Sequence, residues 1–201
     1  MSLTINQNDV INALHNLMGH RVNPGGTDDD YKRYIQDSFN YCWRYYPWTF
    51  SLKKATVDVD GILPEDFDHE GYRKFDGVTE ITMEESLTST SGAVIVWDTA
   101  KSRYKLDPAS GATVAYQYTP PTLGTDASGS APFPSAMAVA IGARVLAKQG
   151  ENPTRADVQQ EWDEWHSHLD RLAGRASNNR PRSRARNYHD KTGSFTGDVG
   201  N

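Results

Sequence analysis

The stretch TDDDYKRYIQDSFNYCWRYYPWTF, residues 27–50, decides more about the fold than any other part of the chain. Its apolar side chains recur every three or four residues, which is the spacing of one face of an α-helix. Acidic residues fill the first turn, where the helix dipole favours them, and Pro47 stops the pattern. The sequence therefore predicts a helix over residues 28–46 whose mostly aromatic face comprises Tyr31, Tyr34, Ile35, Ser38, Phe39, Cys42, Trp43 and Tyr46.

Two roles are open for this aromatic face and for the tryptophans that resemble it elsewhere. Packing in the core of the chain is the simpler role, and contact with a neighbouring subunit is the other, because aromatic residues are also enriched at interfaces. The candidate residues for core packing or a subunit interface are Tyr34, Phe39, Trp43, Tyr46, Trp48, Trp162 and Trp165.

Three further helices are predicted, over residues 6–18, 135–149 and 155–173. Thr4 or Asn6 is a suitable cap for the first helix, and Gly19, Gly150 and Gly174 are suitable ends. Small residues around Gly142 keep the third helix slim, so another backbone can approach it closely. The fourth helix carries a narrow apolar seam of the kind that two helices share, formed by Val158, Trp162, Trp165, Leu169 and Leu172.

The middle third of the chain, residues 48–120, has the alternating apolar pattern of β-strands. The runs that alternate or are apolar lie at residues 55–59, 78–83, 93–97, 103–106 and 113–118, with Gly and Ser clusters between them. This predicts an antiparallel meander. The fold class is therefore α+β, a small bundle of about four helices with an inserted antiparallel β-sheet domain. The main domain covers residues 1–175.

Residues 176–201 are predicted to be an extended C-terminal arm, because no apolar periodicity remains there to order the segment. Residues 171–191 hold seven basic residues and one acid, whereas residues 1–170 hold 14 basic and 24 acidic residues, a net charge of −10. An acidic body with a basic arm implies two different kinds of contact. The arm residues expected to bind a partner are Arg180, Arg182, Arg184, Arg186, Tyr188, Lys191 and Phe195.

The arm is either a tail that only keeps the protein in solution or a segment that binds a protein or a nucleic acid. Spaced arginines contact phosphates without reading sequence, and they also pair with acidic grooves of proteins. Tyr188 and Phe195 favour the protein, because aromatic anchors on an extended segment are suited to docking.

No constellation of residues predicts catalysis, so we expect no enzyme activity, no catalytic residue, no metal and no cofactor. Cys42 is the single cysteine, which rules out an internal disulfide, and its place on an apolar face predicts burial. His166 and His168 are two residues apart, which points them in different directions on a helix, and solvated surface histidines are the simpler interpretation. The dense charges from Glu65 to Glu70 are expected to form a solvated loop. No secretory signal and no membrane-spanning run is recognisable in the sequence.

The order of these segments resembles that of a known family. The first helix leads to the long aromatic helix ending in YYPWTF (45–50), and a β insert with LPEDF (63–67) follows. Then come AYQYTP (115–120), PFP (132–134), an alanine-rich helix and a last helix with its arm. Over nearly the whole chain this order is similar to that of the head–tail connector adaptors of tailed bacteriophages, which sit directly beneath the portal in the neck of the virion.

The resemblance implies a location, partners and a role. It implies a structural protein made in the host cytoplasm that assembles as a dodecameric ring under the portal protein. The ring would extend the channel for genomic double-stranded DNA, without sequence-specific binding, and would dock the next neck or tail protein, a stopper or tail hub. The arm would extend along the portal and lock the adaptor to it. No membrane contact is implied.

Three other interpretations remain open. The chain could be a different neck, tail or baseplate component, although four helix patterns are not typical of a β-rich tail tube. It could bind nucleic acid through the basic arm, in which case affinity for duplex DNA would fall steeply with salt. It could be a cell-wall hydrolase that uses carboxylates such as Glu65, Asp66 and Glu70.

Overall fold

The computed structural model describes residues 4–17, 28–76, 81–83, 93–107, 112–151 and 156–177. The chain divides into two compact units. The helical unit combines residues Met1–Tyr46 with Leu123–Asn201, and the β unit is the segment Pro47–Thr122 between them. The predicted α+β class is confirmed, with four α-helices in the described part of the chain and a sheet-forming segment inserted between the second and the third.

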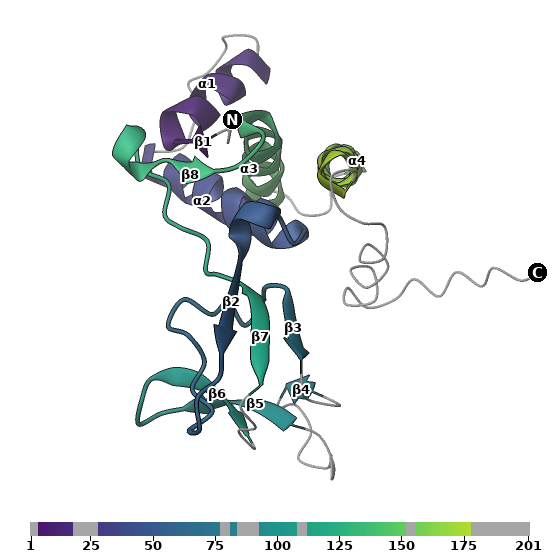
Figure 1. Ribbon diagram of the computed structural model, residues 1–201. Coiled ribbons are helices and arrows are strands. Elements are labelled where there is room, and N and C mark those ends of the chain that lie inside the picture. Colours follow the sequence, from purple (N-terminus) through teal and green to yellow (C-terminus); the bar gives the residue numbers. More distant parts are fainter. Residues whose placement is uncertain are drawn as a thin grey trace, which may run out of the picture. The chain divides into compact units, whose positions relative to one another are not determined.

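The helical unit contains α1 (Gln7–Leu17), α2 (Asp28–Tyr45), α3 (Ala136–Glu151) and α4 (Ala156–Ser177) (Figure 1). Asn6, one of the two caps that the sequence allows, caps α1. Its side-chain oxygen accepts from the Asp9 N–H at 3.0 Å, and the Asp9 carboxylate accepts from the Asn6 N–H at 2.9 Å. This reciprocal pair is a capping box. Ser135 caps α3 in a similar way by accepting from the Ala138 N–H at 3.1 Å.

Two helix ends differ from the prediction, because neither Gly150 nor Gly174 stops its helix. α3 continues to Glu151 and α4 continues to Ser177. A glycine inside a helix costs only about 1 kcal/mol relative to alanine, so favourable flanking residues override it. A Cβ at Gly150 would lie 2.8 Å from the Tyr34 hydroxyl, so the glycine serves close packing there. α4 includes Ala176 and Ser177, which were predicted to belong to the arm, and residues 178–201 lie outside the described residues.

The core of the helical unit is built from one face of each helix. Val10 and Leu14 of α1 are buried, as are the apolar faces of the other three helices. Phe39 is at the centre, with its ring 5.5 Å from that of Trp43 and 5.9 Å from that of Phe133. Ring pairs at such separations add to the burial of apolar surface.

Two short strands close the helical unit and were not predicted. β1 (Thr4–Ile5) pairs antiparallel with β8 (Ala131–Pro132). The described residues also contain two short 3-10 turns. These are η1 (Thr49–Ser51) in the β unit and η2 (Ala127–Gly129) in the helical unit. Strands of two residues carry no alternation that a sequence pattern could reveal.

The β unit holds two three-stranded sheets. In the first sheet, β7 (Thr113–Gln117) runs between β2 (Leu52–Thr56) and β3 (Arg73–Asp76), as Figure 1 shows. The second sheet has the order β4 (Ile81–Met83), β5 (Ala93–Asp98) and β6 (Arg103–Asp107). The first strand of the insert, β2, pairs with its last strand, β7, so the strand order is not that of the simple meander expected. The pair of β4 and β5 is parallel, whereas the other strand pairs of the two sheets are antiparallel.

The β unit has its own apolar core. It contains the buried residues Val57, Leu63, Phe67, Ile95, Leu106, Ala112, Val114 and Tyr116. Val114 and Tyr116 alternate along β7 and face this core, which leaves Thr113 and Ala115 on the opposite face of the first sheet. Each unit therefore buries an apolar core of its own.

None of the helices in the described ranges has the length and apolar character needed to cross a lipid bilayer.

Candidate functional site

Helices α2, α3 and α4 meet most closely at Gly142. The Ser38 hydroxyl of α2 donates a buried 2.8 Å hydrogen bond to the Val139 carbonyl of α3. A Cβ built at Gly142 would lie 2.2 Å from the Ser38 oxygen and 2.2 Å from Cζ2 of Trp165 on α4. The sequence predicted the close approach of a backbone to this helix, but the groups that approach Gly142 are a side-chain hydroxyl and an indole ring.

An aromatic cluster joins α2 to α4 beside this junction. It consists of Tyr41, Tyr45, Trp162, Trp165 and His166. The Tyr41 ring lies 4.7 Å from Trp165 and is nearly parallel to the His166 ring at 5.8 Å. The Tyr41 hydroxyl and His166 Nε2 share a hydrogen bond of 2.7 Å. The Tyr45 hydroxyl donates to Asp170 at 2.6 Å. Polar tips on aromatic bodies thus fix how α4 packs against α2.

Ionic contacts connect α3 to α4 on another side of the junction. Glu161 of α4 pairs with Arg144 at 3.4 Å and with Lys148, both on α3. All three side chains are mostly buried, so the pairs are less screened by water than ordinary surface pairs. Because Arg144 and Lys148 are four residues apart, they reach the same carboxylate from one face of α3.

Cys42 lies in the core of the helical unit and is fully buried. Burial raises the pKa of its thiol to about 12, although hydrogen bonds from the Ser38 and Trp165 side chains lower it in part. A thiol with such a pKa is not a nucleophile near neutral pH.

The predicted aromatic residues take up different positions. Phe39, Trp43, Trp165 and Tyr46 are buried in the helical unit. Trp48 is also buried, and its ring is stacked on that of Phe50 at 5.9 Å. Tyr34 and Trp162 are only partly buried. The buried rings pack within the chain, and a subunit-interface role for Tyr34 and Trp162 stays a prediction.

The predicted arm residues Arg180, Arg182, Arg184, Arg186, Tyr188, Lys191 and Phe195 lie outside the described residues. Their role stays a prediction from the sequence.

The charged residues from Glu65 to Glu70 were expected to form a solvated loop, and Glu65, His69 and Glu70 are exposed, whereas Asp68 is buried. Glu65 pairs with Arg103 at 3.1 Å. Asp66 pairs with Lys53 and accepts from the Tyr116 hydroxyl at 2.7 Å. Burial alone would raise the pKa of Asp66, but Lys53 and Tyr116 together lower it. These carboxylates brace the β unit through separate partners. Among the described residues, no group of three or more His, Cys, Asp or Glu side chains is arranged to hold a metal ion.

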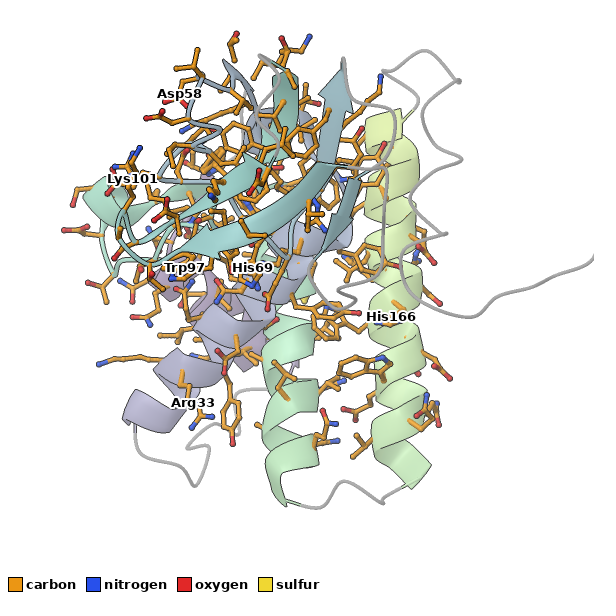
Figure 2. The ribbon with its side chains drawn as sticks, turned by 90° about the horizontal axis from the view of Figure 1, so that it is seen from below. Arg33, Asp58, His69, Trp97, Lys101 and His166 are labelled. Atoms are coloured by element: carbon orange, nitrogen blue, oxygen red, sulfur yellow. The ribbon has the colours of Figure 1, made fainter. Side chains whose placement is uncertain are left out.

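His166 was expected to be solvated, but it is partly buried in the aromatic cluster (Figure 2). Tyr41 and Tyr45 were not predicted to be part of a site. Their spacing of four residues puts them on one helix face, adjacent to the face whose apolar spacing is regular. The sequence did carry a signal for this site, because Tyr41 and Tyr45 form a second aromatic face on the same helix. Tyrosine and histidine rings with polar tips would have had to be considered as contact residues between helices.

The burial of two histidines on α4 predicts that the helical unit loses stability in mild acid. Burial lowers the pKa of His166, although the nearby charges of Asp170 and Asp163 partly oppose this shift. The pKa of His168 is lowered by burial and by the positive charges of Arg171 and Arg175. An unfolded histidine has a pKa of about 6.5, so the unfolded chain binds more protons. Stability is therefore complete above about pH 6.5 and is lost as the pH falls toward the folded pKa values.

Denaturant unfolding at about pH 7.5 and about pH 5.5 measures this loss. We expect a lower midpoint at the acidic pH, and a smaller difference in the variant H166Q/H168Q. If the unfolding midpoint fell by the same amount in both proteins, His166 and His168 would not be the origin of the loss of stability in acid.

A partly exposed aromatic rim borders the core of the β unit. Trp97 of β5 is 50% exposed, and its ring lies edge-on to Tyr104 at 4.9 Å. His69 stacks on Tyr104 at 5.0 Å, and Figure 2 labels His69 and Trp97 on this unit. The rim extends the buried Ile95–Leu106 pair along the same face of the sheet.

A comparison of the chain with protein-family models finds no matching family, and a comparison with curated proteins finds no significant match.

Proposed function

We propose that this chain is a structural virion protein, a head–tail connector adaptor that forms a ring beneath a portal protein. The observation that supports the proposal most is the order of its parts. Both ends of the chain build the helical unit, the β unit is inserted after α2, and the chain continues beyond α4 into a basic segment. This is the order that the resemblance to phage adaptors implies.

The segment after α4 is the proposed contact with the portal. Residues 178–201 hold five basic residues and two acids, a net charge of +3 from 5 − 2. Arginines bind carboxylates in a bidentate manner, so an acidic groove on the portal is the matching surface. Tyr188 and Phe195 would then be apolar anchors on either side of Lys191.

The acidic body suits a ring around a DNA channel. Residues 1–170 carry a net charge of −10, from 14 − 24. Phosphates and carboxylates repel one another at short range, so DNA would pass the ring without being retained. The next neck or tail protein would dock on the ring.

Affinity for the portal of the same virus tests the proposal. A chain truncated after Ser177 keeps all of α4. We expect it to bind the portal at least about a hundredfold more weakly than the full chain, because multiple charge-assisted pairs are lost. The variant R180A/R182A/R184A/R186A should lose most of the same affinity.

The matched control replaces the same four arginines with lysine. The charge is then retained and bidentate pairing is lost, so intermediate affinity would identify guanidinium recognition of carboxylates. Titration of the full and the truncated chain with duplex DNA tests the alternative that the arm binds nucleic acid. A truncated chain that loses DNA binding but still binds the portal would contradict the proposed role of the arm.

A further inference from the structure

An ionic cluster is mostly buried between α3 and α4, and its groups are incompletely paired. It consists of Glu161, Arg144 and Lys148, and we name these three residues the buried cluster. The Glu161 side chain is only 17% exposed, and it faces both cations. Arg144 Nε and Glu161 Oε2 lie 3.4 Å apart and are shielded from solvent, but neither atom has a hydrogen bond within the described part of the chain.

Such a cluster is a poor source of stability. Moving charges out of water costs free energy, and their attraction repays this cost only when good hydrogen bonds accompany it. One of the two contacts of Glu161 lacks that geometry. The cluster also has a net charge of +1, from 2 − 1, so one positive charge is not balanced within it.

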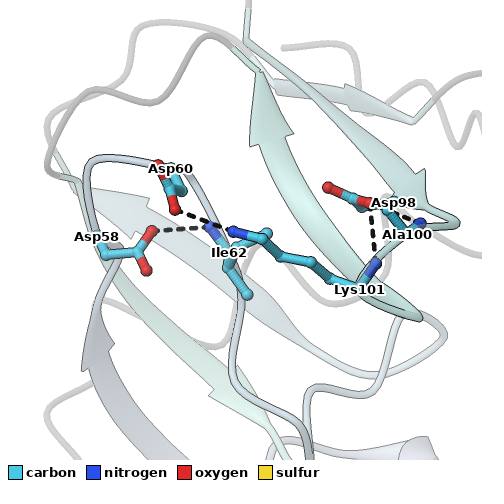
Figure 3. A network of polar contacts seen from close by, with 6 residues as sticks. All are labelled: Asp58, Asp60, Ile62, Asp98, Ala100 and Lys101. Carbon is cyan, nitrogen blue, oxygen red and sulfur yellow. Dashed lines mark hydrogen bonds and ion pairs between the residues drawn. The ribbon is translucent and has the colours of Figure 1, made fainter.

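An exposed ion pair in the β unit shows the contrast. Lys101 donates to Asp60 at 2.9 Å and joins two turns, in which the Asp58 and Asp98 carboxylates accept from backbone N–H groups (Figure 3). Both side chains of the pair are about half exposed, so they stay hydrated. An exposed pair adds little stability but also has little desolvation to overcome. Pairing alone therefore does not explain why charges are placed inside the contact between α3 and α4.

The apolar seam of α4 does not define the position of this helix along α3. Its buried members are Val158, Trp165 and Leu169. A displacement of α4 by four residues, about 6 Å along its axis, brings Trp162 to the place of Val158. It also brings Leu169 to the place of Trp165 and Ala173 to the place of Leu169. Every incoming residue is apolar, so the seam by its polarity permits a displaced register.

The contacts to α2 exclude the displaced register only in part. Asp170 would take the place of His166, and its carboxylate can accept from the Tyr41 hydroxyl as the imidazole does. Tyr45 would lose Asp170 as its acceptor, but this hydrogen bond is exposed and water can replace it.

The buried cluster does exclude the displaced register. Trp165 would take the place of Glu161, so Arg144 and Lys148 would face an indole ring. Two mostly buried cations without their carboxylate are strongly unfavourable, because no water or acid compensates their charge.

We propose that the buried cluster is a register lock, which holds α4 at one position along α3 and lowers the stability of the helical unit instead of raising it. α4 ends at Ser177, so its register sets where the segment 178–201 begins. The importance of this position for portal binding rests on the proposed function, whereas the lock itself does not.

A distance between spin labels tests the lock in the full chain. Gln149 near the end of α3 and Arg175 near the end of α4 are both exposed, and they carry the labels as Q149C/R175C. Because α3 and α4 run in opposite directions, displacing α4 by four residues changes this distance by about 6 Å. The native Cys42 is buried and its thiol pKa is raised to about 12, so it takes up no label.

We expect one narrow distance in the labelled native chain. The apolar variant R144M/K148M/E161L should show a second distance that differs by about 6 Å. The matched control R144E/K148E/E161K inverts the charges and keeps the pairing, so it should show one distance. A single unchanged distance in the apolar variant would overturn the lock, as would a second distance in the charge-inverted control.

Unfolding in urea tests the cost of the cluster. The midpoint of E161L should fall by about 1 M urea or more, because two cations lose their carboxylate. The apolar variant should unfold at the native midpoint or above it, because no buried charge remains. Removing the exposed pair with D60N/K101Q should leave the midpoint nearly unchanged. A midpoint of the apolar variant below that of the native chain would show that the cluster stabilises the fold, against the proposal.

The outcomes separate this proposal from the adaptor function, because the label distances are measured without a portal. If the apolar variant shows two registers but the native chain does not bind a portal, the lock stands and the adaptor function falls. If the native chain binds a portal but the apolar variant keeps one register, the lock is overturned and the adaptor function stands.

Discussion

Replacing Gly142 with alanine will destabilise the helical unit by about 3 kcal/mol, because the added methyl group has no space. The new Cβ would lie 2.2 Å from the Ser38 oxygen and 2.2 Å from a ring carbon of Trp165. Moving Ser38 breaks its buried hydrogen bond to Val139, and moving Trp165 disturbs the aromatic cluster. Equilibrium unfolding in denaturant measures the effect.

Gly174→Ala is the matched control, because it is the same substitution in a neighbouring helix. Nothing lies within 4 Å of a Cβ at Gly174. The alanine should therefore stabilise α4 by about 0.5–1 kcal/mol through helix propensity alone. If both variants were equally stable, the close packing of α2, α3 and α4 at Gly142 would be wrong.

Leu106→Ala will destabilise the β unit by about 3 kcal/mol. Leu106 is buried opposite Ile95 in the core of the unit, and its backbone N–H donates to the Gly61 carbonyl at 2.8 Å. Removing its side chain leaves a cavity between the sheets that rigid strands cannot close. Hydrogen exchange should show the largest loss of protection within residues 47–122.

Val59→Ala is the control for this experiment. Val59 is 93% exposed, so its truncation should change the unfolding free energy by less than about 0.5 kcal/mol. A loss in V59A comparable to that in L106A would contradict the position of the β-unit core.

The four helices could be predicted from the sequence because their signals are local. The spacing of Ile35, Phe39, Cys42 and Trp43 is complete within a few turns, and Pro47 follows directly. The predicted helix ends at Gly150 and Gly174 were wrong. The free-energy cost of one glycine in a helix is smaller than the stabilisation from the residues around it.

The pairing of strands and helices could not be predicted, because it depends on contacts between distant residues. Ser38 bonds to Val139 across 101 positions, and Tyr41 bonds to His166 across 125. β3 was missed because Arg73–Asp76 has little apolar alternation, and its strand form comes from pairing with β7.

We propose that this chain adds a ring to a portal through its C-terminal segment. Electron micrographs of the portal of the same virus, mixed with the full chain or with the chain ending at Ser177, are the decisive measurement. We expect a second ring stacked on the portal with the full chain, and bare portals with the truncated one. Bare portals in both mixtures would contradict the claim and favour another neck or tail component.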